Sequence, residues 1–141
     1  MKYILDTNIF NRLLDGRVSL ADLPSDGKFV ATHVQRDELE NTRDPARRQQ
    51  LLNTFTAVIA EVGVVASMVF DVSGLDRSRW SDGQLYRDLK GDLDVLKNKA
   101  NNVQDSIIAE VAIVDGLTLL TADGNLAKVA QKHGAKFIKL P

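Results

Sequence analysis

Apolar residues recur along this chain in two patterns: short continuous runs and longer stretches with helical spacing. The short β-prone runs at 2–5, 29–32, 117–121 and 136–140 predict strands, and 62–66 is a candidate for one more. Helical spacing predicts helices over 8–14, 34–40, 45–61, 84–99, 103–114 and 125–132. Because strands alternate with helices, the pattern predicts an α/β fold with three layers, α/β/α, around a central, mainly parallel sheet.

Local signals mark one helix start and one loop. Asp44 followed by Pro45 is typical of a helix that begins with an N-cap residue and a proline in its first turn. The stretch 71–82 is rich in charges and turn residues, which predicts a surface loop. Trp80 lies in this loop, where it either anchors the loop or stacks on a base of a nucleic acid.

Length and composition narrow the class of protein. The chain has 141 residues, which predicts a single domain over 1–141. It contains no cysteine, which excludes disulfides, thiolate zinc sites and cysteine nucleophiles, and fits a cytoplasmic protein. No apolar run is long enough to span a membrane, and the N-terminus does not have the pattern of a signal peptide.

Acidic residues fall where a parallel sheet is expected to carry its ligand pocket. Asp6 directly follows the first predicted strand, and Asp123 follows the strand at 117–121. Glu38 lies in the helix after the second strand, and Asp105 lies at the start of the strongly apolar helix over 103–114. Since ligands of open α/β sheets bind outside the carboxyl ends of the strands, these side chains are expected to meet at one edge.

Each acid taken alone also has an ordinary structural role. Asp6, Asp105 and Asp123 can cap the helices that follow them, and Glu38 can be a solvated helix charge. The joint pattern favours a shared pocket. Several carboxylates in one place need a cation, and hard oxygen ligands in a chain without cysteine select Mg²⁺ or Mn²⁺.

The charge balance allows a nucleic-acid substrate without establishing one. The net charge is −1, which alone argues weakly against nucleic-acid binding. Without the four acids, however, the rest of the chain is net positive. Arg43, Arg47 and Arg48 follow the Glu38 helix, and they form either a solvated helix face or a set of phosphate contacts that steers RNA towards the acids.

Other catalytic chemistries lack a residue that they need. A phosphatase with Asp6 as nucleophile needs a second acid two residues later, and position 8 is asparagine. His33 and His133 are isolated in the sequence, which is more typical of surface or hydrogen-bonded histidines than of ligands. The chain also has no glycine-rich loop of the kind that holds phosphates or a dinucleotide.

With these motifs the chain resembles the PIN-domain proteins, the family of the VapC toxins of bacterial toxin–antitoxin pairs. The resemblance covers nearly the whole chain and rests on four segments in order. They are Leu5-Asp6-Thr7-Asn8, Glu38-Leu39, Asp105-Ser106-Ile107-Ile108-Ala109 and Thr121-Ala122-Asp123.

The resemblance implies metal-dependent hydrolysis of RNA. It implies that Asp6, Glu38, Asp105 and Asp123 are the catalytic acids, and that Asp6, Asp105 and Asp123 are the ligands of Mg²⁺ or Mn²⁺.

Three further positions bear on how well the site would work. Asn8 and Thr121 match supporting polar residues of the family, whereas Asn125 stands where many relatives carry another acid. The asparagine keeps an alternative open, a PIN-like RNA- or protein-binding module with weak or no nuclease activity.

The resemblance also implies partners: an RNA substrate, a second copy in a homodimer, and a small antitoxin whose C-terminal segment lies in a groove. We expect the acidic pocket to open onto an exposed apolar groove bordered by the helices between 34 and 61, together with Leu13 or Leu14. The alternative is that these apolar side chains all pack in the core.

Overall fold

The computed structural model describes residues 2–59, 61–62, 84–99 and 102–141. Within these residues five strands form one sheet: β1 (Lys2–Leu5), β2 (Lys28–Ala31), β3 (Glu61–Val62), β4 (Thr118–Thr121) and β5 (Lys136–Lys139). The strand order is β3-β2-β1-β4-β5, and every neighbouring pair is parallel. The predicted fold class, a parallel sheet in an α/β chain, is therefore confirmed.

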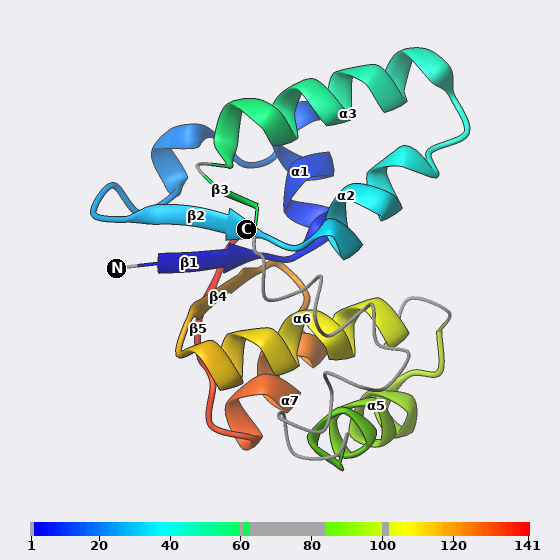
Figure 1. Cartoon of the computed structure of the whole chain (residues 1–141), viewed down its shortest axis with the longest axis vertical. Helices are drawn as coiled ribbons and strands as arrows, with labels where there is room; N and C mark the ends of the chain where they lie inside the picture. The colour runs from blue at the N-terminus through cyan, green and yellow to red at the C-terminus, as the bar shows by residue number, and fades with distance from the viewer. Residues whose placement is uncertain (1, 60, 63–83, 100–101) are drawn as a thin grey trace.

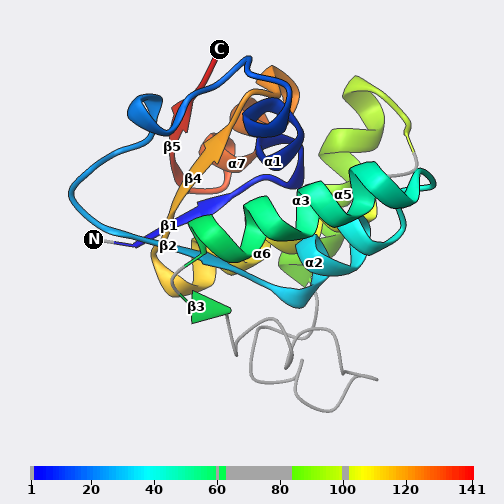
Figure 2. The same cartoon turned by 90° about the horizontal axis from the view of Figure 1, so that it is seen from above.

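Helices cover both faces of this sheet (Figures 1 and 2). One face carries α1 (Thr7–Leu14), α2 (His33–Glu40) and α3 (Pro45–Val58). The other carries α5 (Gln84–Leu96), α6 (Asn102–Asp115) and α7 (Gly124–Lys132). A short 3-10 helix, η1 (Leu20–Asp22), lies between α1 and β2. The three predicted layers are thus present.

Alternate residues of the central strands supply two separate cores. Ile4 of β1 and Leu119 of β4 belong to the core formed with α5, α6 and α7. Their neighbours Leu5 and Leu120 belong to the core formed with α1, α2 and α3. Successive strand residues point to opposite faces, so strands buried on both sides need continuous apolar runs. This is why the sequence shows such runs rather than alternation.

Two helices end earlier than the apolar spacing predicts. The helix expected over 45–61 ends at Val58, where Ile59 takes an extended backbone. Glu61 then pairs with Val30 of β2. The β-branched residues at 58 and 59 favour this change of conformation. The helix expected over 84–99 ends at Leu96, so residues 97–99 leave the helix before α6 begins.

Of the other predictions from the sequence, one is confirmed and two concern residues that the structure does not describe. Asp44 and Pro45 begin α3 as predicted, and Asp44 Oδ1 accepts a hydrogen bond of 3.0 Å from the N–H of Ala46. The loop expected over 71–82, with Trp80, and residues 63–66 of the candidate strand lie outside the described residues. Among the residues that are described, no helix has the length and apolar character needed to cross a membrane.

Candidate active site

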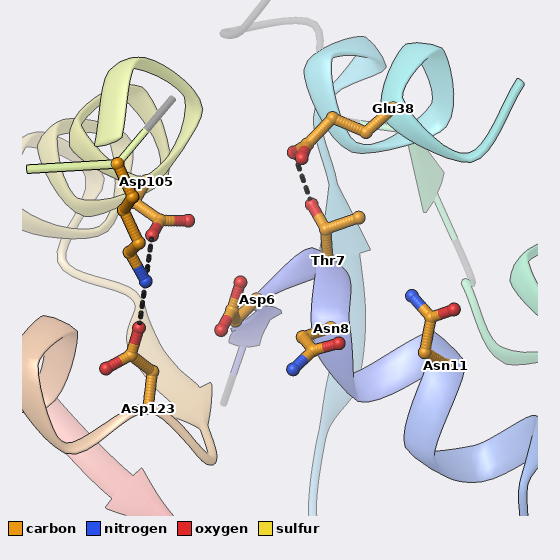
Figure 3. A pocket seen from close by; sticks show the side chains of 8 residues that line it. Asp6, Thr7, Asn8, Asn11, Glu38, Asp105 and Asp123 are labelled. Carbon is orange, nitrogen blue, oxygen red and sulfur yellow. Dashed lines mark hydrogen bonds and ion pairs between the residues drawn. The ribbon is translucent and has the colours of Figure 1, made fainter. Parts of the chain in front are cut away.

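A pocket of about 210 Å³ lies at the carboxyl edge of the sheet, where the strand order reverses between β1 and β4. Open α/β sheets bind their ligands at such a switch point. The pocket is lined by Asp6, Thr7, Asn8, Asn11, Glu38, Lys99, Asp105 and Asp123. The structure therefore brings all four predicted acids together (Figure 3). Their catalytic and metal-binding roles stay predictions.

Asp6 stands at the N-cap position of α1, but its side chain makes no capping hydrogen bond. The residue is only 4% exposed, and Oδ2 accepts a hydrogen bond of 3.0 Å from the Thr121 hydroxyl. Burial raises the pKa of Asp6, and the Thr121 hydrogen bond together with the backbone of Asn8 offsets only part of this effect. The carboxyl group of Asp6 lines the pocket, and its contact with the first turn of α1 is limited to the backbone of Asn8.

Asp123 both caps its helix and faces the pocket. Oδ1 accepts hydrogen bonds from the backbone N–H groups of Asn125 (2.9 Å) and Leu126 (3.3 Å). Oδ2 lies 2.8 Å from Nζ of Lys99. Burial alone would raise the pKa of Asp123, but the hydrogen bond and charge of Lys99, with the two capping bonds, hold it below its ordinary value.

Thr121 joins the two acids that follow the central strands. Its buried hydroxyl donates to Asp6 Oδ2 and accepts from the N–H of Asp123, at 3.0 Å in each case. Asn8 lines the pocket, whereas Thr121 and Asn125 are not among its lining residues. The supporting roles of these three residues stay predictions.

Asp105 is the fourth residue of α6 and is 3% exposed. Its Oδ2 lies 3.8 Å from Nζ of Lys99. Burial, followed by the charge of Asp6, raises the pKa of Asp105 to about 8, although Lys99 works in the opposite direction. Asp105 thus faces the pocket rather than bulk solvent.

A hydrogen bond between α2 and β1 fixes the position of the helix that carries Glu38. Gln35, one turn earlier on α2, is fully buried, and its Nε2 donates to the carbonyl of Leu5 at the end of β1. On the pocket side, the Thr7 hydroxyl donates to Glu38 Oε1 at 2.7 Å. Burial raises the pKa of Glu38 to about 7, against the lowering effect of the Thr7 hydrogen bond.

Three pocket residues were not predicted: Thr7, Asn11 and Lys99. Asn11 follows Thr7 and Asn8 by four and three residues on α1, so helical spacing could have placed it on the same face. The sequence has no comparable signal for Lys99. Residues 97–99 lie outside the helix, so helical spacing does not predict where their side chains point.

The three arginines after α2 have different surroundings. Arg47 forms a two-pronged pair with Asp15, at 2.9 and 3.0 Å, and donates to Asn11 Oδ1 at 3.0 Å. Arg48 donates to backbone carbonyls of the α2–α3 connection, while Arg43 is exposed. Their contact with a phosphate stays a prediction, and Arg47 is linked to the pocket wall through Asn11.

A second hollow, of about 280 Å³, lies between α2 and α6 and shares Glu38 with the acidic pocket. It is lined by Val34, Asp37, Glu38, Asn41, Val103, Gln104 and Ile107. α2 borders this hollow as expected, but α3 does not, because Leu51 and Phe55 are buried in the core. Leu13 and Leu14 also pack against that core, partly buried. For these side chains the core-packing alternative is the one observed.

The donor set suits a divalent cation in its chemistry. Carboxylate, amide and hydroxyl oxygens are the ligands that Mg²⁺ and Mn²⁺ prefer. As the side chains stand, however, no three acidic or histidine groups of the described residues converge closely enough to hold one ion. Lys99 Nζ lies between Asp105 and Asp123 instead. In the present arrangement an ammonium group is paired with two of the four acids.

Comparison with known proteins supports the fold. No known family model matches the chain, and no curated protein sequence matches it. Among solved structures, the chain is similar to a chain in the crystal structure of VapBC2 from Rickettsia felis bound to a DNA fragment from their promoter. The TM-score is 0.63 over 100% of both chains, with 18% sequence identity, so the likeness is one of fold.

Proposed function

We propose that this protein is a Mg²⁺- or Mn²⁺-dependent endoribonuclease that hydrolyses RNA phosphodiester bonds. The proposal is carried by one observation: carboxyl groups from four separate segments of the chain line a single pocket at the switch point of the sheet. Bringing like charges together in a buried place is costly, and such perturbed groups cluster at functional sites.

Three of the acids would hold the ion, namely Asp6, Asp105 and Asp123, and Glu38 would accept a proton. A bound divalent ion supplies positive charge to the phosphate and lowers the pKa of a coordinated water. Glu38 suits proton transfer because its pKa of about 7 is close to neutral pH. Thr7 orients this carboxyl group by donating to Oε1, which leaves Oε2 to take the proton of the attacking water.

We further infer that the nuclease is a VapC-type toxin held silent by a small antitoxin. Two observations support this role: the likeness of fold over the full length of a chain from a VapBC2 complex, and the four motifs in family order. An arginine of the partner could pair with two carboxylates of the pocket. The hollow between α2 and α6 offers a place for the partner's segment beside Glu38.

Incubation of the purified protein with RNA tests the chemistry. We expect fragments in Mg²⁺ or Mn²⁺ and none in EDTA. Asp105→Asn is the matched variant, because it removes one ligand charge with little change in shape and relieves repulsion in the pocket. It should retain the circular dichroism spectrum and yield no fragments. Fragments that form in EDTA, or equal cleavage by Asp105→Asn, would reject the site.

Expression in cells tests the role as a toxin. Induction of this chain alone is expected to arrest growth, and co-expression of the gene beside it is expected to relieve the arrest and yield a co-purifying small protein. Free growth without a small partner would favour an RNA-processing role instead.

The alternative function is a PIN-like RNA- or protein-binding module with weak or no nuclease activity. Two features favour it: Lys99 is paired with Asp105 and Asp123, and position 125 is asparagine. RNA retention on a filter that is unchanged by EDTA, without fragments in any metal, would support this module over the nuclease.

A further inference from the structure

The acidic pocket contains a cation that belongs to the chain itself. Lys99 Nζ is 2.8 Å from Asp123 Oδ2 and 3.8 Å from Asp105 Oδ2. We propose that Lys99 is the resident counter-ion of the pocket, and that a divalent ion binds by displacing its ammonium group from these two carboxylates. The inference rests on the proposed function, since it takes the pocket as the metal site.

The backbone that carries Lys99 is held by a buried asparagine. Asn102 Nδ2 donates to Asp94 Oδ1 at 2.8 Å and to the carbonyl of Lys97 at 2.9 Å. The N–H of Asn102 donates to the carbonyl of Lys99 at 3.1 Å. The side chain of Lys99 is only 28% exposed, whereas Lys97 is an exposed residue. These hydrogen bonds fix the backbone carbonyls of Lys97 and Lys99, and the side chain of Lys99 lines the pocket.

Lys99 supplies one positive charge to a pocket that four acidic residues line. Its Nζ is close to one oxygen of Asp123 and one oxygen of Asp105, while Asp6 and Glu38 line the same pocket without an ion pair to it. One ammonium group cannot neutralise four carboxylates. The pocket therefore has room for a larger positive charge, which a divalent ion carries.

The ammonium group and a metal ion would compete for the same oxygen atoms. Asp123 Oδ1 is occupied by the backbone of α7, and Oδ2 is bonded to Lys99. An ion arriving at Oδ2 would meet the ammonium group at close range, where like charges repel strongly. The present side-chain positions also leave no three acidic or histidine groups of the described chain around one point. Departure of Lys99 would let Asp105 and Asp123 turn towards a shared ion.

Mn²⁺ binding, followed by electron paramagnetic resonance at pH 8 and low salt, tests the displacement. Lys99→Met is expected to bind Mn²⁺ roughly tenfold more tightly than the wild type, a change that corresponds to about 1.4 kcal/mol. Binding to this variant no longer has to break the ion pairs of Lys99. Lys97→Met is the matched control, two residues away on the exposed side, and should bind like the wild type. Lys99→Arg keeps the charge and should also bind weakly.

Thermal unfolding in EDTA gives a second readout. Lys99→Met should melt roughly 2–4 °C below the wild type, because Asp105 and Asp123 lose their counter-ion. Saturating Mn²⁺ should close this gap, since the variant gains more from the ion than the wild type does. Lys99→Gln serves as a second variant if the methionine does not fold.

The outcomes separate this inference from the proposed function. Suppose that the wild type and Lys99→Met bind Mn²⁺ equally while Asp105→Asn does not bind it. The metal site then stands and the counter-ion role is overturned. Weaker binding by Lys99→Met would also overturn it, because Lys99 would then be needed to hold the ligands. Absence of Mn²⁺ binding in every variant would reject the metal site, and both proposals with it.

Discussion

Asp6 and Asp123 occupy equivalent places in the fold and have opposite environments. Each follows a central strand and stands at the N-cap position of the next helix. Asp123 caps α7 and pairs with Lys99, so its pKa lies below its ordinary value. Asp6 has no assigned side-chain capping hydrogen bond to α1, is deeply buried and has a raised pKa.

The difference shows that a position at the end of a strand determines where an acid lies, but not its hydrogen-bond partners or its pKa. The carboxylate of Asp123 is already held by backbone donors and a cation. Asp6 is bonded by the hydroxyl of Thr121 and is repelled by Asp123. Of these two acids, Asp6 therefore has more to gain from a metal ion, and Asp123 contributes more to the fold.

The largest effect should come from Asp6→Asn. Loss of this ligand charge is expected to reduce RNA cleavage by roughly 100-fold or more, the scale seen when a group that stabilises a transition state is removed. Melting in EDTA should be unchanged or higher, because the variant removes a buried carboxyl group that its neighbours repel. Cleavage assays and melting curves in EDTA measure the two effects. A clearly lower melting temperature would mean that Asp6 stabilises the fold after all.

The pH dependence of stability should follow the acids with raised pKa values. Glu38 and Asp105 have ordinary values of 4.5 and 3.8 and folded values of about 7 and about 8. Between these limits the folded state binds more protons than the unfolded state, so stability falls as the pH rises from about 4 to about 8. We expect stability to fall by several kcal/mol over this range, since one pKa unit is worth about 1.4 kcal/mol and both pKa values are raised by more than two units.

Urea denaturation in EDTA at several pH values across this range measures the loss. Saturating Mg²⁺ should reduce the slope, because an ion favours the ionised carboxylates. Stability that increases over the same range in EDTA would contradict the raised pKa values.

Two substitutions at Asp123 separate its capping role from its role in the pocket. Both Asp123→Asn and Asp123→Ala remove the carboxylate nearest to Lys99, and both should lose cleavage. Asparagine can still cap α7 and alanine cannot, so the alanine variant should be less stable by about 1 kcal/mol. Urea denaturation of the pair measures the difference. Equal stability would mean that the hydrogen bonds to Asn125 and Leu126 contribute little.

The smallest effect should come from Thr7→Val. The Thr7 hydroxyl lowers the pKa of Glu38, so its loss should raise that pKa further above its ordinary value. The acidic limb of the cleavage profile should move to higher pH by about half a unit, since a net hydrogen bond is worth about 1 kcal/mol. Thr54→Val is the control, because the Thr54 hydroxyl bonds within α3. An unmoved limb would remove Glu38 as the proton acceptor.

The fold could be predicted because its central strands are buried on both faces, which leaves continuous apolar runs in the sequence. The helix ends were less predictable. Apolar spacing continues past Val58, yet the next residues are taken up by pairing of Glu61 with Val30, a contact across 31 positions that no local pattern contains.

The positions of the acids could be predicted for a related reason. Parallel strands bring their carboxyl ends to one edge, so Asp6 and Asp123 were expected on the same edge. They are neighbours there because β1 pairs with β4. Lys99 could not be found in this way, because its direction depends on the hydrogen bonds of Asn102. Arg47 is a similar case, since its partner Asp15 lies 32 positions away.

The backbone hydrogen bond of Asp6 links the integrity of the acidic pocket to the unfolding of the whole protein. Its N–H donates to the carbonyl of Leu120 at 2.9 Å, at the end of the ladder between β1 and β4. β1 has a neighbouring strand on both sides and contributes to both cores. Separating these strands therefore dismantles the whole molecule, and the Asp6 amide should exchange with deuterium at the rate set by global unfolding. Proteases and heat would then inactivate the acid cluster in one cooperative step rather than by partial opening around it.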